Sequence, residues 1–408
     1  MKLKVCMLVA NHPFLDARIF KKEAKSLLKR GYDVTLVVPR KNGYLFDIDG
    51  SPFTDRFLEP SFLYEGIKIV TYHEQKESFA QRYSNVKSNK TGSFQNELTK
   101  TGLAQKADIY HAHEFSSLYS AVGIKRALSA EGMKVKLIYD SHEISPDPLS
   151  VQNSANKKKL LRMLDRMIKE VDYIITVSDA IKNWYIIRNP NIPVEVIYNS
   201  PPFAQDHHIK LFDDNGLTVC HEGNITRYKG NAELIFGIVF QCSKSMPFTF
   251  KIIGGTRQGK TLPVPSRISR YIKQTGWVEY HEIPEHMKDA DIGWLHLDTS
   301  NSLNRTFALP NKFFSYLNNG IPVVVNKCCE MERIIRTHHC GLVINKTNPT
   351  VEDYAEAFEY MNRNRTRLQK MSVNARNAMK NWYCWEHMEK RLFLVYEHLS
   401  MARKKYFI

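Results

Sequence analysis

Histidines and acids occur repeatedly at the carboxyl ends of the strands that the sequence predicts. His113 and Glu114 follow a short apolar run, and His142 and Glu143 follow another. Imidazole and carboxylate groups can orient hydroxyls and move protons. Parallel α/β sheets bind ligands where loops leave the carboxyl ends of their strands, so this placement predicts a binding site. Further residues at such positions are His12, Asp16, Arg18, His111, Asp140, Asn199, His221, Glu222, Gly223, Asn224, Arg227 and Lys229.

The elements that must position these residues begin with a βαβ unit. Residues 4–10 form a buried-strand run, residues 18–30 carry apolar side chains at helical spacing up to Gly31, and residues 33–38 form a second strand. Such a unit predicts a parallel sheet with a right-handed crossover. Further strands are expected at residues 67–72, 109–111, 136–139, 173–177 and 195–198. The polar segment 75–105 is expected to be an irregular helix or a surface loop.

A second series of elements starts near Gly216. Strands are expected at 217–221, 248–253, 292–297 and 322–326, with helices at 232–241 and 311–319. Because 408 residues exceed the usual size of one core, we expect two Rossmann-like α/β domains facing each other across a cleft. The prolines after Ser200 suit a linker. The predicted domains are 1–205 and 206–384, with a helix at about 385–408 returning to the first.

The composition of the chain limits the kinds of partner and the cellular compartment that we expect. The formal net charge of +16 favours an anionic partner, but the chain carries no recognisable nucleic-acid-binding module, so no nucleic acid is expected. The seven cysteines are scattered and predict reduced thiols. No apolar run reaches the ~20 residues that span a bilayer, and the opening apolar run is too short for a signal peptide. We therefore expect a cytoplasmic protein.

Several stretches resemble the family-4-like retaining glycosyltransferases, which have the two-Rossmann GT-B fold. The resemblance covers nearly the whole chain. It rests on the order and spacing of N-H-P-F-L-D-A-R-I-F-K-K-E, A-D-I-Y-H-A-H-E, I-Y-D-S-H-E, V-I-Y-N-S-P-P, G-N-I-T-R-Y-K-G and A-L-P-N-K-F-F-S-Y-L-N-N-G-I-P-V-V. It implies that residues 1–205 form the acceptor-side domain and residues 206–384 the donor-binding domain.

The resemblance implies a donor site around Gly223. A nucleotide diphosphate leaving group gains negative charge as the glycosidic bond breaks, and cations and helix N-termini stabilise that charge. Lys229 and Lys312 are the candidate cations. The family places an arginine after the glycine that matches Gly223, whereas this chain has Asn224 there, so Arg227 is a candidate substitute.

This chain departs from the family at two acidic positions. Ser315 stands where the family has a glutamate that holds the donor ribose, and Phe307 stands where a partner glutamate is common. A serine can make one hydrogen bond but not a carboxylate's charge-assisted pair. Glu330 could compensate from another direction, although a solvated residue at a helix start is the simpler interpretation.

On the acceptor side, His113 matches the family's active-site histidine, which contacts the donor sugar, and Glu114 adjoins it. His12, Asp16, Arg18, His142 and Glu143 are the expected acceptor-side residues. His111 is expected to face the core while His113 faces the site. The histidines and acids could also suggest a metal site, but the spacing is not typical of one and the family needs no divalent cation. We therefore expect no metal and no cofactor, with the nucleotide sugar as co-substrate.

The segment 157–170 predicts an amphipathic helix. Its apolar residues share one face and its six Lys and Arg residues gather on the other. An ordinary surface helix has this pattern. A basic face lying on anionic lipid has it too, and would suit a lipid-linked acceptor and a peripheral position on the inner face of the cell membrane.

The sequence thus predicts a retaining hexosyltransferase that extends a glycan or lipid-linked acceptor in cell-surface polysaccharide or glycoconjugate biosynthesis. Two alternatives remain open at this stage. One is a nucleotide-sugar epimerase of the same architecture, which needs no acceptor. The other is a catalytically degenerate protein that binds sugar nucleotides, for which Phe307 and Ser315 are the evidence.

Overall fold

The structure is a computed structural model that describes residues 2–74, 77–88, 93–150, 154–205, 216–223, 225, 231–255 and 261–404. The chain divides into two compact units. The first comprises Met1–Tyr198 and Met388–Ile408, and the second comprises Asn199–His387. The division thus falls a few residues before the expected boundary at 205, and the last helix belongs mostly to the first unit.

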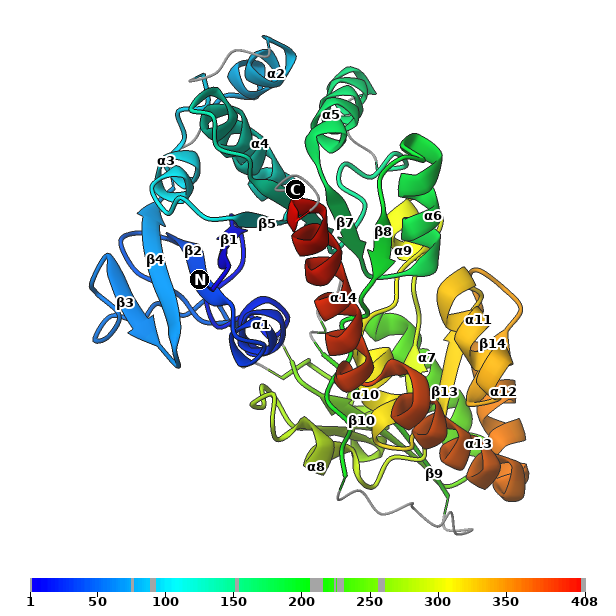
Figure 1. The fold of residues 1–408 in the computed structure, drawn as a ribbon. Coiled ribbons are helices and arrows are strands. Elements are labelled where there is room, and N and C mark those ends of the chain that lie inside the picture. The colour runs from blue at the N-terminus through cyan, green and yellow to red at the C-terminus, as the bar shows by residue number, and fades with distance from the viewer. Residues whose placement is uncertain are drawn as a thin grey trace. The chain divides into compact units, whose positions relative to one another are not determined.

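In its described residues, the first unit is built on an eight-stranded sheet with the order β3-β4-β2-β1-β5-β6-β7-β8 (Figure 1). All neighbouring strands are parallel except β3 and β4. The strands are β1 (Lys4–Val9), β2 (Asp33–Arg40), β3 (Ser61–Tyr64), β4 (Ile67–His73), β5 (Ile109–His113), β6 (Lys136–Ser141), β7 (Tyr173–Thr176) and β8 (Val194–Val196).

The strand register explains why the polar residues of this unit meet. Val9 at the end of β1 pairs with His113 of β5, and His113 pairs with Asp140 of β6. The carboxyl ends of three central strands therefore lie level with one another. Residues Val5–Val9 are all buried, which accounts for the uninterrupted apolar run of β1.

Helices connect and cover these strands. They are η1 (Ile19–Ala24), α1 (Lys25–Lys29), α2 (Phe79–Ser88), α3 (Glu97–Leu103), α4 (Glu114–Ala130), α5 (Ser154–Met167), η2 (Ile168–Glu170), α6 (Asp179–Arg188) and α14 (Trp385–Lys404). The expected helix 18–30 is η1 followed by α1, and Gly31 ends it with φ +98°. The segment 75–105 contains α2 and α3 and includes residues 75–76 and 89–92, which lie outside the described residues.

Helix α14 packs on the first unit. Tyr396 stacks edge-on against Tyr32, whose ring centroid lies 5.3 Å away, and its hydroxyl is 2.9 Å from His111 Nδ1. Arg391 donates to the backbone oxygen of Val196 over 3.0 Å. This helix therefore contributes directly to the packing around the buried His111 of β5.

The second unit is built, in its described residues, on a six-stranded parallel sheet with the order β11-β10-β9-β12-β13-β14. Its strands are β9 (Leu217–Glu222), β10 (Phe248–Ile253), β11 (Ile272–Gln274), β12 (Ile292–Leu295), β13 (Val323–Asn326) and β14 (Gly341–Ile344). Its helices are α7 (Ala232–Ser245), η3 (Ser266–Tyr271), α8 (Ile283–Met287), α9 (Leu303–Thr306), α10 (Asn311–Asn318), α11 (Cys329–His338), α12 (Val351–Arg363), α13 (Arg365–Ala378) and η4 (Met379–Tyr383).

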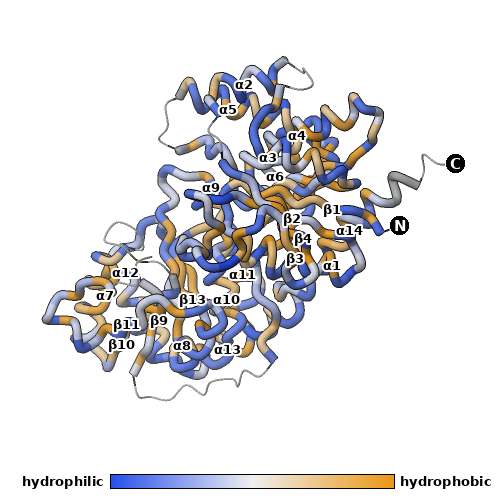
Figure 2. Tube along the Cα trace, turned by 90° about the vertical axis from the view of Figure 1, so that its left-hand side faces the viewer, coloured by the Kyte–Doolittle hydropathy of each residue, from blue (hydrophilic) through white to orange (hydrophobic). Residues whose placement is uncertain are grey.

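Each unit has its own apolar interior. In the second unit, α7 and α12 pack on the sheet through buried side chains such as Ile235, Val239 and Phe358. Figure 2 shows apolar residues concentrated along strands such as β1, β2 and β13. The prediction of two parallel α/β domains is therefore confirmed. Among the described residues, no helix combines the length and apolar character that crossing a membrane requires. All seven cysteines are free thiols.

Candidate functional site

Arg18 and Asp140 form the buried centre of the strand-end cluster in the first unit. Arg18 Nε and Nη2 donate to the two carboxylate oxygens of Asp140, each over 3.0 Å, and Nη1 donates to the backbone oxygen of Ile197 over 2.8 Å. Burial alone would raise the pKa of Asp140, but Arg18 and the nearby histidines outweigh it and hold the pKa well below its usual range. Arg18, expected on the acceptor side, is only 2% exposed and therefore acts as a positioning residue.

Glu23 of η1 lies in the same buried cluster, with Oε1 2.9 Å from Arg18 Nε. Burial raises its pKa well above the usual range, and the negative charge of Asp140 adds to the effect. Arg18 opposes that rise, because its guanidinium faces the carboxyl groups of both Glu23 and Asp140.

Asp140 holds two histidines. Its Oδ2 atom is 3.3 Å from His113 Nδ1 and 3.1 Å from His142 Nε2. Burial lowers the pKa of His113 to about 4, although Asp140 opposes this shift. His113 is consequently neutral at physiological pH. Its Nε2 atom is buried and has no hydrogen-bond partner among the described residues. A neutral imidazole with one unused nitrogen can hydrogen-bond a sugar hydroxyl.

His111 and His113 lie on the same face of β5. Their rings stack with centroids 4.3 Å apart, and both side chains are fully buried. The expectation that one faces the core and the other the site is wrong, because residues two apart in a strand point to the same side. Burial and the neighbouring His113 lower the pKa of His111 well below its usual value, so it is also neutral.

A more exposed group lies at the start of α4. His12 Nδ1 is 3.3 Å from Asp16, and His12 Nε2 is 3.9 Å from Glu114 Oε1. Glu114 Oε1 is also 3.4 Å from His142 Nδ1. Burial opposes protonation of His12, but Asp16 and Glu114 outweigh it and raise the pKa to about 10. His12 is therefore a cation at the edge of the site. Glu143 lies nearby along the chain, exposed beyond β6.

Two groups of side chains in this unit could hold a metal ion by the proximity of their ligand atoms. In the first, formed by Glu23, His111, His113 and Asp140, the Arg18 guanidinium already occupies the cationic position. In the second, formed by His12, Glu114 and His142, the ligand atoms lie within 4.8 Å of one another. Asp16 and Asp140 hold the other nitrogens of its two histidines, as carboxylates do in metal sites.

The second unit carries a separate cluster at the carboxyl end of β9. Lys312, the second residue of α10, places its Nζ 3.3 Å from His221 Nε2. Gly223 has φ +111°, and a Cβ built on it would lie 3.1 Å from that Nζ, so a side chain here would crowd the lysine. Burial lowers the pKa of Lys312 to about 8, while Glu222 opposes the shift. A partly desolvated cation at a helix start suits an anionic ligand.

Glu222 is the residue of this cluster whose role the sequence did not identify. Its Oε2 atom is buried without a hydrogen-bond partner among the described residues. Burial raises the pKa of Glu222, whereas Lys312 and a hydrogen bond from Ser315 lower it. Glu222 thus places a carboxylate beside the serine that replaces the family's glutamate. By contrast, Glu330 is buried on α11 and pairs with Arg333 over 3.0 Å. Asn224, Arg227 and Lys229 lie outside the described residues.

Two known protein families together match most of the chain. Residues 17–200 match the family described as Glycosyltransferase Family 4, and residues 237–382 match the Glucosyltransferase 3-like, C-terminal domain. Among curated protein sequences, none matches this chain significantly.

Solved structures of glycosyltransferases share the fold. Sucrose-phosphate synthase from Thermosynechococcus elongatus is similar over 98% of this chain and 100% of its own, with 11% identity and a TM-score of 0.66. Anabaena HepE in complex with UDP is similar over 98% of this chain and 100% of its own, with 14% identity and a TM-score of 0.64. The lipopolysaccharide outer core galactosyltransferase WaaB in its apo form is similar over 96% of this chain and 99% of its own, with 13% identity and a TM-score of 0.61.

Proposed function

We propose that this chain transfers a hexose from a nucleotide sugar to a glycan or lipid-linked acceptor. It joins a glycosyltransferase family 4 domain to a glucosyltransferase 3-like C-terminal domain and so belongs to the GT-B glycosyltransferases. The observation that carries the proposal is the pairing of a partly desolvated Lys312 with Gly223 at the carboxyl end of β9. A cation there meets the charge that develops on a departing diphosphate.

The donor is a uridine diphosphate sugar in this proposal. HepE structures hold UDP and UDP-glucose, and their fold is the fold of this chain. Glu222, beside Ser315, supplies the carboxylate for the ribose hydroxyls. This arrangement favours an active transferase over a degenerate binding protein, because the acidic group missing at Ser315 is present on the adjacent strand end.

Transfer proceeds with retention of anomeric configuration. His113 binds a hydroxyl of the donor sugar through its unused Nε2, and Asp140 and Arg18 hold the ring in place. The leaving diphosphate accepts the proton of the acceptor hydroxyl on the same face, so no carboxylate pair of the glycosidase type is required. His12, Glu114 and His142 lie where they can orient the acceptor. We assign this group no metal, because His12 itself supplies a positive charge there.

The test is a panel of uridine, guanosine and cytidine diphosphate sugars incubated with purified protein and glycan acceptors. The proposal expects nucleotide release that requires acceptor and is unchanged by a chelator. Turnover of the donor without acceptor would indicate an epimerase, and binding without turnover would indicate a degenerate protein. Loss of turnover on chelation, restored by a divalent cation, would place a metal at His12, Glu114 and His142.

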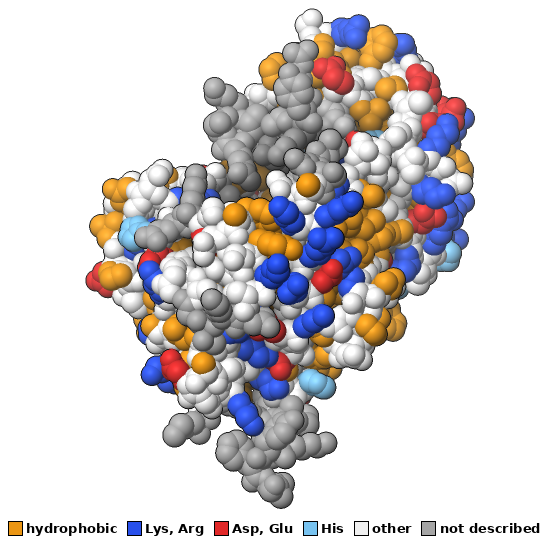
Figure 3. Space-filling model, turned by 90° about the horizontal axis from the view of Figure 1, so that it is seen from above, with side chains coloured by type: hydrophobic (Ala, Val, Ile, Leu, Met, Phe, Trp, Pro, Cys, Tyr) orange, Lys and Arg blue, Asp and Glu red, His pale blue; other side chains and the backbone are white. Residues whose placement is uncertain are grey.

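A role at an anionic membrane surface is part of the same proposal. On α5, Leu164 and Met167 are buried, whereas Lys158, Lys159, Arg162 and Arg166 are exposed. Figure 3 shows Lys and Arg side chains prominent on the face seen from above. Basic residues attract anionic lipid by about 1 kcal/mol each near the surface. Sedimentation with vesicles containing phosphatidylglycerol tests this, with vesicles of phosphatidylcholine alone as the control.

A further inference from the structure

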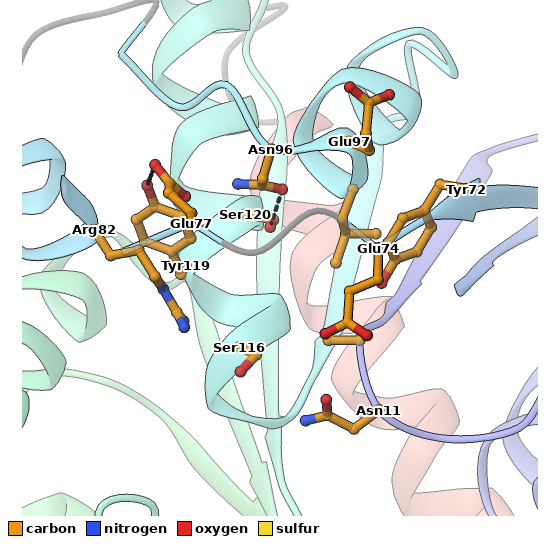
Figure 4. A pocket seen from close by; sticks show the side chains of 12 residues that line it. Asn11, Tyr72, Glu74, Glu77, Arg82, Asn96, Glu97, Ser116, Tyr119 and Ser120 are labelled. Atoms are coloured by element: carbon orange, nitrogen blue, oxygen red, sulfur yellow. Dashed lines mark hydrogen bonds between the residues drawn. The ribbon is translucent and has the colours of Figure 1, made fainter. Parts of the chain in front are cut away.

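A cavity of about 270 Å³ opens in the first unit beside the strand-end cluster. Asn11, which precedes His12, lines it from the end of β1, and Ser116, two residues after Glu114, lines it from α4. Figure 4 shows these two side chains on one side of the cavity, with Tyr119, Asn96 and Glu97 beyond them. Two residues that line the cavity therefore lie beside His12 and Glu114 of the candidate acceptor site along the chain.

Hydrogen bonds hold the polar lining in place. Tyr119 donates its hydroxyl to Glu77 Oε1 over 2.9 Å, and Asn85 donates to the same oxygen over 2.9 Å. Ser120 donates to Asn96 Oδ1 over 2.9 Å, and that oxygen also caps α3 by accepting from the Thr99 backbone (Figure 4). One oxygen of Glu77 and the amide oxygen of Asn96 are therefore already used by the protein.

The other polar atom of each side chain is left for a ligand. Glu77 Oε2 and Asn96 Nδ2 are both buried, and neither has a hydrogen-bond partner among the described residues. A buried polar atom without a partner is costly. One atom accepts and the other donates, and hydroxyl groups can do both. A ligand that carries several hydroxyls would satisfy both atoms at once.

The charge of the lining excludes anions. Glu74, Glu77 and Glu97 line the cavity, and the cation among the lining residues is Arg82, whose guanidinium lies 4.9 Å from the centroid of the Tyr119 ring. Even with Glu97 paired to Lys100 over 2.8 Å, carboxylates outnumber cations. In a chain with a formal net charge of +16, this acidic lining sets the cavity apart from its surroundings.

The geometry points to a binding site for one uncharged sugar residue of the acceptor. The volume of about 270 Å³ lies just below the ~300–1,000 Å³ typical of drug-sized ligands, so one monosaccharide fits better than an oligosaccharide. The inference rests on the proposed function, because it assigns the cavity to the acceptor of that reaction. It predicts that the sugar next to the reacting hydroxyl carries neither phosphate nor carboxylate.

Binding can be measured without any donor. Methyl glycosides of glucose, galactose and mannose are titrated into the full chain by ligand-observed NMR, each beside its 6-phosphate and its uronate. At least one neutral glycoside is expected to bind at least tenfold more tightly than its two anionic counterparts. Equal or tighter binding of the anions, or no binding of any neutral glycoside, would overturn the inference.

Two isosteric variants locate the binding. Glu77→Gln keeps an oxygen for Tyr119 but replaces a carboxylate acceptor, and Asn96→Asp keeps the α3 cap but removes the amide donor. Each is expected to weaken neutral-glycoside binding at least tenfold. Glu131→Gln, at the exposed far end of α4, is the matched control and is expected to change nothing.

Ser116→Met covers the case in which either variant fails to fold, because it fills the cavity without removing Glu77 or Asn96. It is expected to abolish binding while thermal unfolding stays cooperative. Unchanged binding in all folded variants would overturn the inference. If Ser116→Met still transfers sugar with the wild-type KM for the acceptor, the inference is overturned, whereas the proposed function remains intact. Neutral-glycoside binding without nucleotide release from any donor would instead remove the proposed function and leave the cavity assignment standing.

Discussion

Arg18 and Asp140 make a buried bidentate ion pair that links the start of η1 to the end of β6, 122 residues further along the chain. Two histidines depend on this pair, because Asp140 holds both His113 and His142. The guanidinium keeps Asp140 ionised, and the ionised carboxylate fixes the tautomer and orientation of the imidazoles.

Asp140→Asn is expected to destabilise the protein strongly. The substitution preserves shape but removes the carboxylate that accepts two hydrogen bonds from the buried Arg18, and losing one partner of a buried pair typically costs about 3–5 kcal/mol. Chemical denaturation measures the free energy of unfolding. Asp165→Asn removes the partner of Arg188 in a more exposed ion pair and is the control, expected to cost at most about 1 kcal/mol. Equal losses in the two variants would contradict the role given to the buried pair.

The pH dependence of stability tests the charge on His12. Its folded pKa of about 10 lies above the unfolded value of ~6.5, so its contribution is complete below the unfolded value and is lost as pH rises towards the folded one. As pH rises between these two values, the free energy of unfolding is therefore expected to fall further in wild type than in His12→Gln. Parallel curves of unfolding free energy against pH would show that His12 is not held as a cation.

Much of the fold could be predicted because local pattern and burial coincide. Val34, Leu36, Val37 and Val38 are apolar because β2 lies between β1 and β4 and buries these side chains, and Gly31 can end the preceding helix because its φ is positive. Three edge strands, β3, β11 and β14, were missed, and β11 spans only Ile272–Gln274. In β3, Leu63 is 73% exposed, and β14 is only half-buried, so neither carries the apolar run of a central strand.

The candidate site could be predicted only in part. The strand ends identified His113, Asp140 and His142 as polar residues at one edge of the sheet. The charge of Asp140 depends on its pairing with Arg18, which one sequence does not reveal because the two residues lie far apart in the chain. The placement of Glu222 beside Ser315 depends likewise on β9 meeting α10.

Nucleotide binding is expected to depend on the lysines of the second unit. Lys312→Ala and Lys229→Ala should each lower turnover at least tenfold, which corresponds to roughly 1.4 kcal/mol. Because the pKa of Lys312 is about 8, affinity for the nucleoside diphosphate is expected to fall as pH rises through that value, and not to fall in Lys312→Arg. Lys244→Ala, on the exposed surface of the same unit, is the control. Unchanged kinetics in Lys312→Ala would assign the diphosphate to another cation.

The carboxylate of Glu222 is expected to replace the one absent at Ser315. Glu222→Gln should weaken nucleotide binding about tenfold. Ser315→Glu alone should not tighten binding, because it sets a second carboxylate beside Glu222. The double variant Glu222→Gln/Ser315→Glu should recover affinity. Calorimetric titration with UDP measures all three, and independent, additive effects would mean that the two positions do not share a ligand.

Proton NMR of the freshly formed product tests the central claim most directly. The chain is incubated with a UDP-α-sugar and an acceptor, and the anomeric coupling constant of the new glycosidic bond is read before any mutarotation of free sugar interferes. The account predicts an α-linked product, made by wild type and lost in His113→Ala. A β-linked product, formed at an undiminished rate by His113→Ala, would contradict it.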